Sequence, residues 1–434
     1  MHQRHNLFRA LFFLLQMPSG IILPYYFLFL RDEAGLDARQ ISYLTGISGL
    51  TIILFQQFWG YMGDVVVPKK YLIVFNSLVS SFCFFLISRQ HSFWIIAVLA
   101  FAQQAASTPL QQLFHGYLFM HEGSERHFGR LRAWGSLGFI AANTGIAFVA
   151  DRITGGKLGF IFPFFVIVTM SFCLLFLPMP DRRTEHAVRP TFLQVQGFFL
   201  GRPQVALFLA VVFFYQAAHG LSYTFQSFLM REMGADMRVV SLSYSLAAFL
   251  ELPVFFALNR LIGRWGETRL ILFAAFVQAL RWLLIWGAAT PGQIIAISAL
   301  HCITFGLFYA AAVSYMNRQA GVALKASAQA IFALVYFGFA AVVGNVAGGQ
   351  VTSGGVLADA MTWFVTQVLH MPDRGGLRNL YIFCSALALI SAGLCMLLIK
   401  REGRDCRQEQ RSHIRRPKAS GIRSNLSLLF FNGR

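Results

Sequence analysis

Twelve apolar runs, each close to the roughly 20 residues that a helix needs to cross a bilayer, limit what this chain can fold into. Of its 434 residues, 56% are hydrophobic and only 12% are charged, which excludes an ordinary soluble protein. We therefore predict an all-α, multi-pass membrane protein. The predicted spans are residues 7–30, 41–61, 71–88, 93–120, 133–149, 158–177, 205–229, 239–258, 270–288, 294–315, 326–346 and 379–399.

The distribution of basic residues predicts the sidedness of the loops. The N-terminal segment and the alternate loops hold 16 Lys and Arg residues, the tail from Lys400 holds ten more, and the loops of the opposite side hold nine. By the positive-inside rule both termini are cytoplasmic, as an even number of spans requires. The net charge of +18 thus reflects topology in a cell membrane, inner or plasma, and we expect no nucleic-acid partner. The basic tail, residues 401–434, is expected to lie solvated near anionic headgroups.

The spans divide into two sets of six. The longest cytoplasmic connection, residues 181–204, is charged and proline-containing, which is typical of a linker between bundles at 1–180 and 205–400. The first spans of the two halves begin about 198 residues apart, and so do the loops after their second spans, 60–64 and 259–263. A weak repeat of this kind indicates a transporter with two pseudosymmetric halves and a solute site between them.

Glu251, Arg281 and His301 lie inside apolar runs at comparable depth. They fall roughly 10, 16 and 21 Å from the cytoplasmic ends of their spans. An ionised side chain near the bilayer centre costs about 2.5 to 3.5 kcal/mol, so we expect the three to face one another or a wet cavity. Desolvation favours a neutral carboxylic acid and a nearby guanidinium favours the carboxylate, so relative movement of Arg281 and Glu251 would load or release a proton. The alternative is a static polar contact that holds three helices together.

No catalytic constellation is visible in the sequence. An enzyme would need a nucleophile with its base or a metal cluster, whereas the intramembrane histidines are scattered and the apolar runs contain a single carboxylate. The six cysteines show no CxxC spacing. We therefore expect no enzymatic activity, no metal and no cofactor. The expected partners are a small solute, protons and the lipid bilayer, and a monomer is expected.

Several segments together resemble one family. Residues 60–64, followed by Lys69 and Lys70, are similar to the loop after the second helix of the major facilitator superfamily, although Val65, Val67 and Pro68 depart from its pattern. Residues 128–139, 218–225, Glu251, Arg281–Trp282 and 300–305 are similar, in that order, to the branch that contains phenylpropionate permease and is related to lactose permease and the nucleoside symporters. This resemblance covers nearly all of residues 7–399. It implies two pseudosymmetric six-helix bundles, alternating access with proton-coupled uptake, and a conformational-switch loop that includes Gly60 and Asp64.

The resemblance also implies roles for single residues. Arg132 corresponds to a substrate-contacting arginine, and Gln112 stands where the family commonly has the carboxylate that pairs with it. A substrate carboxylate could therefore bind Arg132. Lactose permease has another carboxylate one turn after the histidine, where this chain has Thr304, so proton carriage falls on Glu251, alone or with His301. The remaining candidates for substrate contacts, each of which could instead be a packing residue, are His115, Phe139, His219 and Tyr223.

The sequence thus predicts a secondary active transporter, a proton-coupled symporter of a small organic solute. A carboxylate, aromatic carboxylates included, is the expected substrate. A sugar or nucleoside symporter is an alternative, and so is an outward antiporter of drugs or other solutes, because a single acidic residue can serve either direction. A receptor that binds its ligand without accumulating it is a further alternative.

Overall fold

The regular structure of the chain is helical throughout the part that the computed structural model describes, residues 2–119, 124–180, 201–320 and 325–415. Ten helical stretches in this part are long and apolar enough to cross a membrane. The helices α3 (Ala38–Tyr61) and α8 (Ile161–Phe176) complete a set of twelve, and each predicted apolar run falls on one member of the set. The predicted all-α membrane fold is confirmed.

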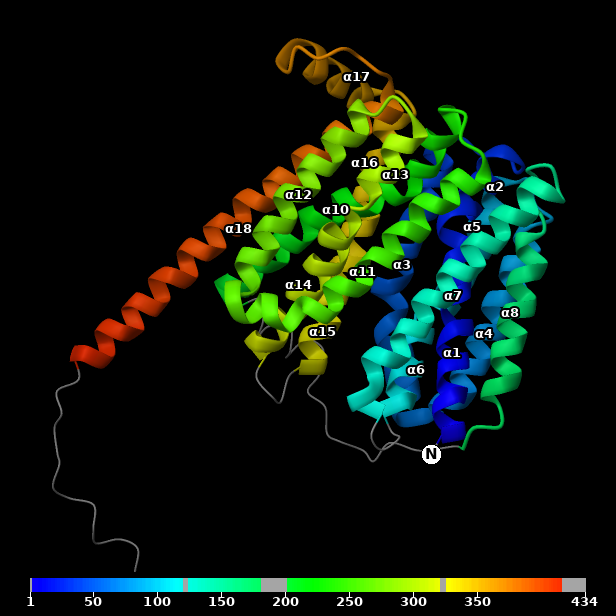
Figure 1. Ribbon diagram of the computed structural model, residues 1–434, viewed down its shortest axis with the longest axis horizontal. Helices are drawn as coiled ribbons and strands as arrows, with labels where there is room; N and C mark the ends of the chain where they lie inside the picture. Colours follow the sequence, from blue (N-terminus) through cyan, green and yellow to red (C-terminus); the bar gives the residue numbers. More distant parts are fainter. Residues whose placement is uncertain (1, 120–123, 181–200, 321–324, 416–434) are drawn as a thin grey trace, which may run out of the picture.

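The helices of residues 2–180 form one bundle, on the right of Figure 1. Within it α1 packs along α7 and α8, and α4 packs along α5 and α8. In chain order the elements of this N-terminal bundle are α1 (His2–Ile21), η1 (Ile22–Tyr26), α2 (Phe27–Asp32), α3, η2 (Met62–Val66), α4 (Lys69–Ile87), α5 (Phe93–Ser107), α6 (Leu110–Phe119), α7 (Ser124–Arg152) and α8.

The helices from residue 203 onward form the second bundle, in which α18 packs along α10 and α12. Its elements are α10 (Pro203–Glu232), α11 (Met237–Trp265), α12 (Glu267–Gly287), α13 (Pro291–Ser298), η3 (Cys302–Leu307), α14 (Phe308–Ala320), α15 (Lys325–Ala333), η4 (Leu334–Phe339), α16 (Ala340–Thr352), α17 (Val356–Trp363), η5 (Phe364–Val368) and α18 (Gly376–Arg415). The predicted linker, residues 181–204, lies almost wholly outside the described residues, so the predicted domain boundaries stay predictions.

Some helix ends differ from the predicted spans, because hydropathy locates the bilayer and not the end of a helix. α11 continues to Trp265 instead of 258 and stops at Gly266, whose φ of +76° favours glycine. α18 continues through the charged residues after 399 as far as Arg415, and Glu402 in this extension pairs with Arg318 at 3.3 Å. The predicted span 93–120 is interrupted before Pro109, which disfavours helix in the residue that precedes it. The short helix α17 was not predicted.

The two bundles meet over one end of the molecule. α3 packs along α16 and η4, and α7 packs along α11. At the first contact the backbones touch, because a β-carbon on Gly49 would lie only 2.6 Å from the carbonyl oxygen of Gly338. Toward the other end, where the chain begins and α18 ends, the bundles diverge in Figure 1. Both ends of the helical set therefore lie at one end of the molecule, as an even number of spans requires.

Gly138 tests the close packing of α7 against α1. A β-carbon on Gly138 would lie 2.0 Å from the carbonyl oxygen of Phe13, whereas one on Gly145 of the same helix would meet nothing within 4 Å. We expect Gly138→Ala to lower the melting temperature of the detergent-purified protein by at least a few degrees, because the backbone of α1 must move. Gly145→Ala is the matched control and should not lower it, since alanine favours helix. Equal melting temperatures for both variants would contradict this packing.

Candidate functional site

The predicted proton-coupling residues lie together in the C-terminal bundle. Nε2 of His301 is 3.0 Å from Oε1 of Glu251, and Nδ1 of His301 is 3.0 Å from Nη1 of Arg281. α11 supplies Glu251, α12 supplies Arg281, and His301 lies just before η3. The imidazole therefore links the carboxylate to the guanidinium, and three consecutive membrane-spanning segments meet at this polar chain.

The partners of His301 define which of its nitrogens carries the proton. A guanidinium has hydrogen-bond donors and no acceptor, so Nδ1 of His301 must accept from Arg281. The single proton of a neutral imidazole is then on Nε2, from which it is donated to Glu251. If Nδ1 were protonated as well, its N–H group and the Nη1 donor of Arg281 would face each other without an acceptor. Within this arrangement Glu251 is the group that can take up a further proton.

Thr304, which stands where lactose permease has a second carboxylate, is a further member of the polar chain. Nη1 of Arg281 donates to its hydroxyl at 2.9 Å. The π-helical turn η3 follows His301 directly, and His301 and Thr304, three residues apart, both face Arg281. Arg281 is 2% exposed, whereas the Glu251 side chain is 14% exposed. Of the side chains in the polar chain, the Glu251 carboxylate is thus the nearest to water.

A row of aromatic rings extends from the polar chain. The rings of His301 and Phe305 are 5.2 Å apart, those of Phe305 and Tyr309 are 5.8 Å apart, and those of Tyr309 and Phe337 are 6.2 Å apart. His219, predicted to contact substrate, is instead buried with its ring 5.3 Å from that of His301. It lies beside the proton-coupling residues in this conformation.

The structure separates the other predicted site residues. Gln112 is exposed on α6, and His115 is partly buried with its ring 5.8 Å from that of Phe12. Phe139 packs against the largest apolar core cluster, which draws residues from both bundles. Their roles in substrate binding stay predictions.

Three further predictions concern side chains outside the described part of the structure. Arg132 is within α7, Tyr223 is within α10 and Asp64 is within η2, but their side chains are not described. Gly60 lies in the last turn of α3. The assignment of Arg132 to substrate and of the 60–64 loop to conformational switching therefore remains a prediction.

A cavity of about 440 Å³ lies within the N-terminal bundle and reaches Phe337 of the second bundle. Its lining residues come chiefly from α1, α4, α5, α6 and α8, and half of them carry an amide or a hydroxyl group. These polar lining residues are Gln16, Ser19, Ser77, Ser80, Gln103, Gln104, Ser107, Thr108, Gln111 and Thr169. Among the side chains that the structure describes, none that lines the cavity is charged. Phe337 is also the last ring of the aromatic row, so the cavity and the polar chain are joined by contacts between side chains.

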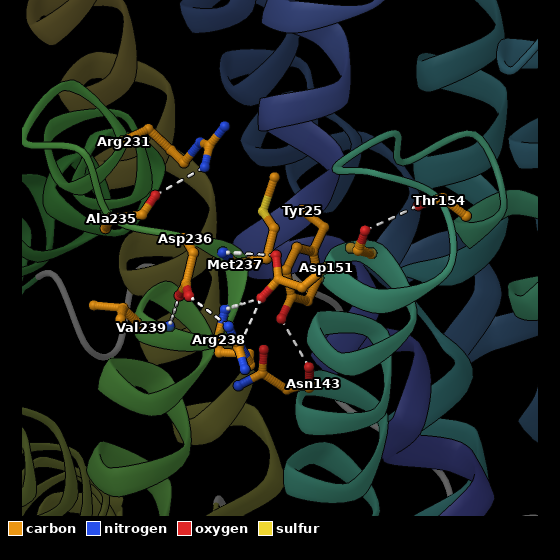
Figure 2. A network of polar contacts seen from close by, with 11 residues as sticks. Tyr25, Asn143, Asp151, Thr154, Arg231, Ala235, Asp236, Met237, Arg238 and Val239 are labelled. Atoms are coloured by element: carbon orange, nitrogen blue, oxygen red, sulfur yellow. Dashed lines mark hydrogen bonds and ion pairs between the residues drawn. The ribbon is translucent and has the colours of Figure 1, made fainter.

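Polar contacts close the end at which the bundles meet (Figure 2). The amide of Asn143 on α7 donates to the carbonyl oxygen and hydroxyl of two residues of α11, Ser241 and Ser245, at 2.9 Å each. At the end of α7, the Asp151 carboxylate accepts from the backbone N–H groups of Met237 and Arg238 and pairs with the Arg238 guanidinium at 3.0 Å. This contact was not predicted, because Asp151 and Arg238 fall in predicted loops, where charged residues are common.

Asp151 therefore caps a helix of the opposite bundle. The first N–H groups of a helix have no partner within it, and they attract negative charge. The residue that precedes α11, Asp236, bonds the N–H of Val239 at 2.8 Å, while Asp151 supplies the acceptor for the two preceding N–H groups. Separation of the bundles at this end must break the bonds from Met237 and Arg238 to Asp151.

Two bundles of membrane-spanning helices, with a buried polar chain inside the second, and relatives that are transporters and not enzymes define the class of this protein: a multi-pass membrane transporter. Within the described residues, no group of three or more His, Cys, Asp or Glu side chains could hold a metal ion. Residues 6–363 match the family model described as "MFS_1 like family", and the chain belongs to that family of the major facilitator superfamily. The resemblance inferred from the sequence is confirmed.

The similar proteins are named as transporters of different solutes. The maltose permease of Geobacillus stearothermophilus is 25% identical over 403 residues, which are 92% of this chain and 95% of that protein. A probable 3-phenylpropionic acid transporter of Escherichia coli is 28% identical over 208 residues, 45% of this chain and 51% of that protein. The crystal structure of the nucleoside transporter NupG, as its D323A mutant, has a TM-score of 0.78 at 15% identity and covers 91% of this chain and 99% of its own. This last likeness shows the fold.

Replacing Asp151 should open the contacting end. Asp151→Ala removes the acceptor for two N–H groups and the partner of Arg238, and hydrogen bonds to a charged group are each worth about 1.5 to 3 kcal/mol. We expect the population open at this end to rise about tenfold or more. The measurement is the distance distribution between spin labels at Lys157 and Glu232, which flank the contact and belong to different bundles.

Asp236→Ala is the matched control for this experiment. It removes a carboxylate from the same helix terminus but leaves the acceptor from α7 in place. Its distance distribution should resemble that of the wild type. Identical distributions for the wild type and Asp151→Ala would show that the cross-bundle cap does not hold this end closed.

Proposed function

We propose that this transporter is a proton-coupled symporter of a neutral, hydroxyl-rich solute, with a saccharide as the first candidate. The observation that carries the proposal is the cavity, whose described lining residues are uncharged and whose amide and hydroxyl groups match a solute that both donates and accepts hydrogen bonds. The maltose permease relative supports a saccharide, and the nucleoside transporters support a nucleoside as the second neutral candidate. In this proposal the protein lies in the cell membrane with cytoplasmic termini, so the end at which the bundles diverge faces the cytoplasm.

Glu251 carries the coupled proton in this proposal. Its carboxylate is the acidic member of the polar chain and the most exposed of the three, while the guanidinium acts on it through His301. Desolvation favours the protonated carboxyl, and the positive charge of Arg281 favours the ionised one. A rearrangement that breaks the bridge through His301 would retain the proton, and one that restores the bridge would release it.

Glu251→Gln tests proton carriage. A permanently neutral amide imitates the loaded carboxyl and has no proton to release, so the variant should exchange solute across the membrane but not accumulate it. Counterflow and pH-driven uptake of maltose in proteoliposomes measure the two activities separately. Accumulation at the wild-type level would remove Glu251 from the proton-coupling role.

Glu267→Gln is the control for the loss of one carboxylate from this bundle. Glu267 pairs with Arg318 at 3.4 Å near the start of α12, away from the His301 chain. Its replacement should leave the ratio of accumulation to exchange unchanged. A loss as large as that in Glu251→Gln would indicate damage to the bundle and not to proton carriage.

The charge of the solute determines which gradient drives uptake. If a neutral solute moves with one proton, each 100 mV contributes about 2.3 kcal/mol, or about a fifty-fold concentration ratio. If a monoanion moves with one proton, the cycle is electroneutral. We expect maltose or uridine uptake to respond to a potassium-diffusion potential set by valinomycin.

The carboxylate substrate predicted from Arg132 and Gln112 is the contrary outcome of the same measurement. Uptake of 3-phenylpropionate that follows the pH gradient, ignores the potential and disappears in Arg132→Gln would support it. That result would overturn the neutral solute and leave the symporter assignment intact. Solute outflow driven by inward proton flow would instead indicate an antiporter.

A further inference from the structure

The cavity of the N-terminal bundle has a wall that does not face the other bundle. Besides residues of α1, its lining includes Ser77 and Ser80 of α4, Gln103 of α5 and Thr169 of α8. α4 packs between α5 and α8, so these residues belong to the interior of the N-terminal bundle. We use the name inner wall for Ser77, Ser80, Gln103 and Thr169. The cavity is thus more than a space between the two halves.

The inner wall is polar although it is buried. Its four residues are between 1% and 7% exposed. The amide Nε2 of Gln103 donates to Oγ of Ser80 at 3.1 Å, which leaves further hydrogen-bonding capacity on both groups. The Thr169 hydroxyl has no hydrogen-bond partner among the described protein atoms. A buried hydroxyl without a partner is unfavourable, and a molecule in the cavity that Thr169 lines can supply the missing hydrogen bond.

The chemistry of the wall defines the group that fits it. Hydroxyls and amides donate as well as accept, and the lining residues whose side chains are described carry no charge. A carboxylate or ammonium group placed there would lose its hydration without gaining an opposite charge. A hydroxyl of a sugar ring would find both donors and acceptors. The volume of about 440 Å³ falls within the usual range of small-molecule sites.

We propose that the inner wall is a solute subsite, in which Ser80, Gln103 and Thr169 bind hydroxyl groups of the transported solute. α4 and α8 then contribute to substrate specificity and are not only scaffold helices. The subsite deepens the proposed function and rests on it, since it takes the solute to be neutral and hydroxylated. It predicts that removing one buried hydroxyl from α8 weakens solute binding.

The test compares Thr169→Val with Thr51→Val in equilibrium binding of maltose to the purified protein. Thr51 is fully buried, but its hydroxyl donates to the carbonyl oxygen of Ser48 in the same helix at 2.8 Å. We expect Thr169→Val to weaken maltose binding roughly 3- to 10-fold, the effect of about one hydrogen bond, and Thr51→Val to leave it unchanged. Thr169→Ser retains a hydroxyl and should restore most of the affinity.

A second readout does not depend on affinity. Thr169→Cys should react with N-ethylmaleimide above the wild-type background, and maltose should slow the reaction. Wild-type affinity in Thr169→Val, or an unreactive Thr169→Cys, would overturn the subsite. Failure of the proposed function differs from this, because the wild type would then accumulate neither maltose nor uridine. If only the subsite fails, wild-type accumulation persists and Thr169→Val binds as tightly as the wild type.

Discussion

The arrangement of the C-terminal bundle depends on a carboxylate and a guanidinium that cannot be left unpaired inside a bilayer. Glu251 and Arg281 both bond to His301, and Thr304 provides a second acceptor for the guanidinium. A bond to each partner satisfies charges whose burial would otherwise be strongly unfavourable. A change of charge at Glu251 therefore alters the hydrogen bonds of the whole polar chain and affects three spanning segments together. This is the property that proton coupling requires of a site, and the partial exposure of Glu251 is consistent with that proposed role.

α11 connects the polar chain around His301 to the closed end of the molecule. It carries Ser241 and Arg238, which contact the N-terminal bundle, and Glu251 lies ten residues, or about 15 Å, beyond Ser241 on the same helix. Pro253 lies inside α11 just after Glu251 and removes one backbone hydrogen bond there. The helix can thus bend close to the carboxylate while its first turns move as a unit. The first turns of α11 can therefore transmit a shift of Glu251 relative to His301 to the Asp151 contacts.

The sequence was sufficient for features that depend on hydropathy or on rare charges. The twelve spans follow from run length, and Glu251, Arg281 and His301 were identified because ionisable residues are scarce in apolar runs. Thr304 stood out only as the position where lactose permease has a carboxylate, and its bond to Arg281 could not be predicted because hydroxyls are common in membrane helices. The inner wall was missed for a similar reason. The sequence does not show whether a serine of α4 or a glutamine of α5 faces a neighbouring helix or a cavity. Only the packing of the helices distinguishes these two environments. The cap by Asp151 depends on which helix terminus lies opposite, which is a property of the assembled bundles.

The separation of the two sites determines how they can be coupled. The described residues of the cavity that we assign to the solute are uncharged, and the charges to which we assign the proton lie in the other bundle, beyond the rings of Phe305, Tyr309 and Phe337. A neutral solute in this cavity changes the electrostatic potential at Glu251 very little, so direct attraction or repulsion cannot couple the two events. The coupling must then be mechanical. A solute that contacts the inner wall and Phe337 touches both bundles and favours their closure around it, whereas the charge of Glu251 biases the position of α11 in the same closure. Two ligands that act on one two-state movement of the bundles are linked without any contact between them.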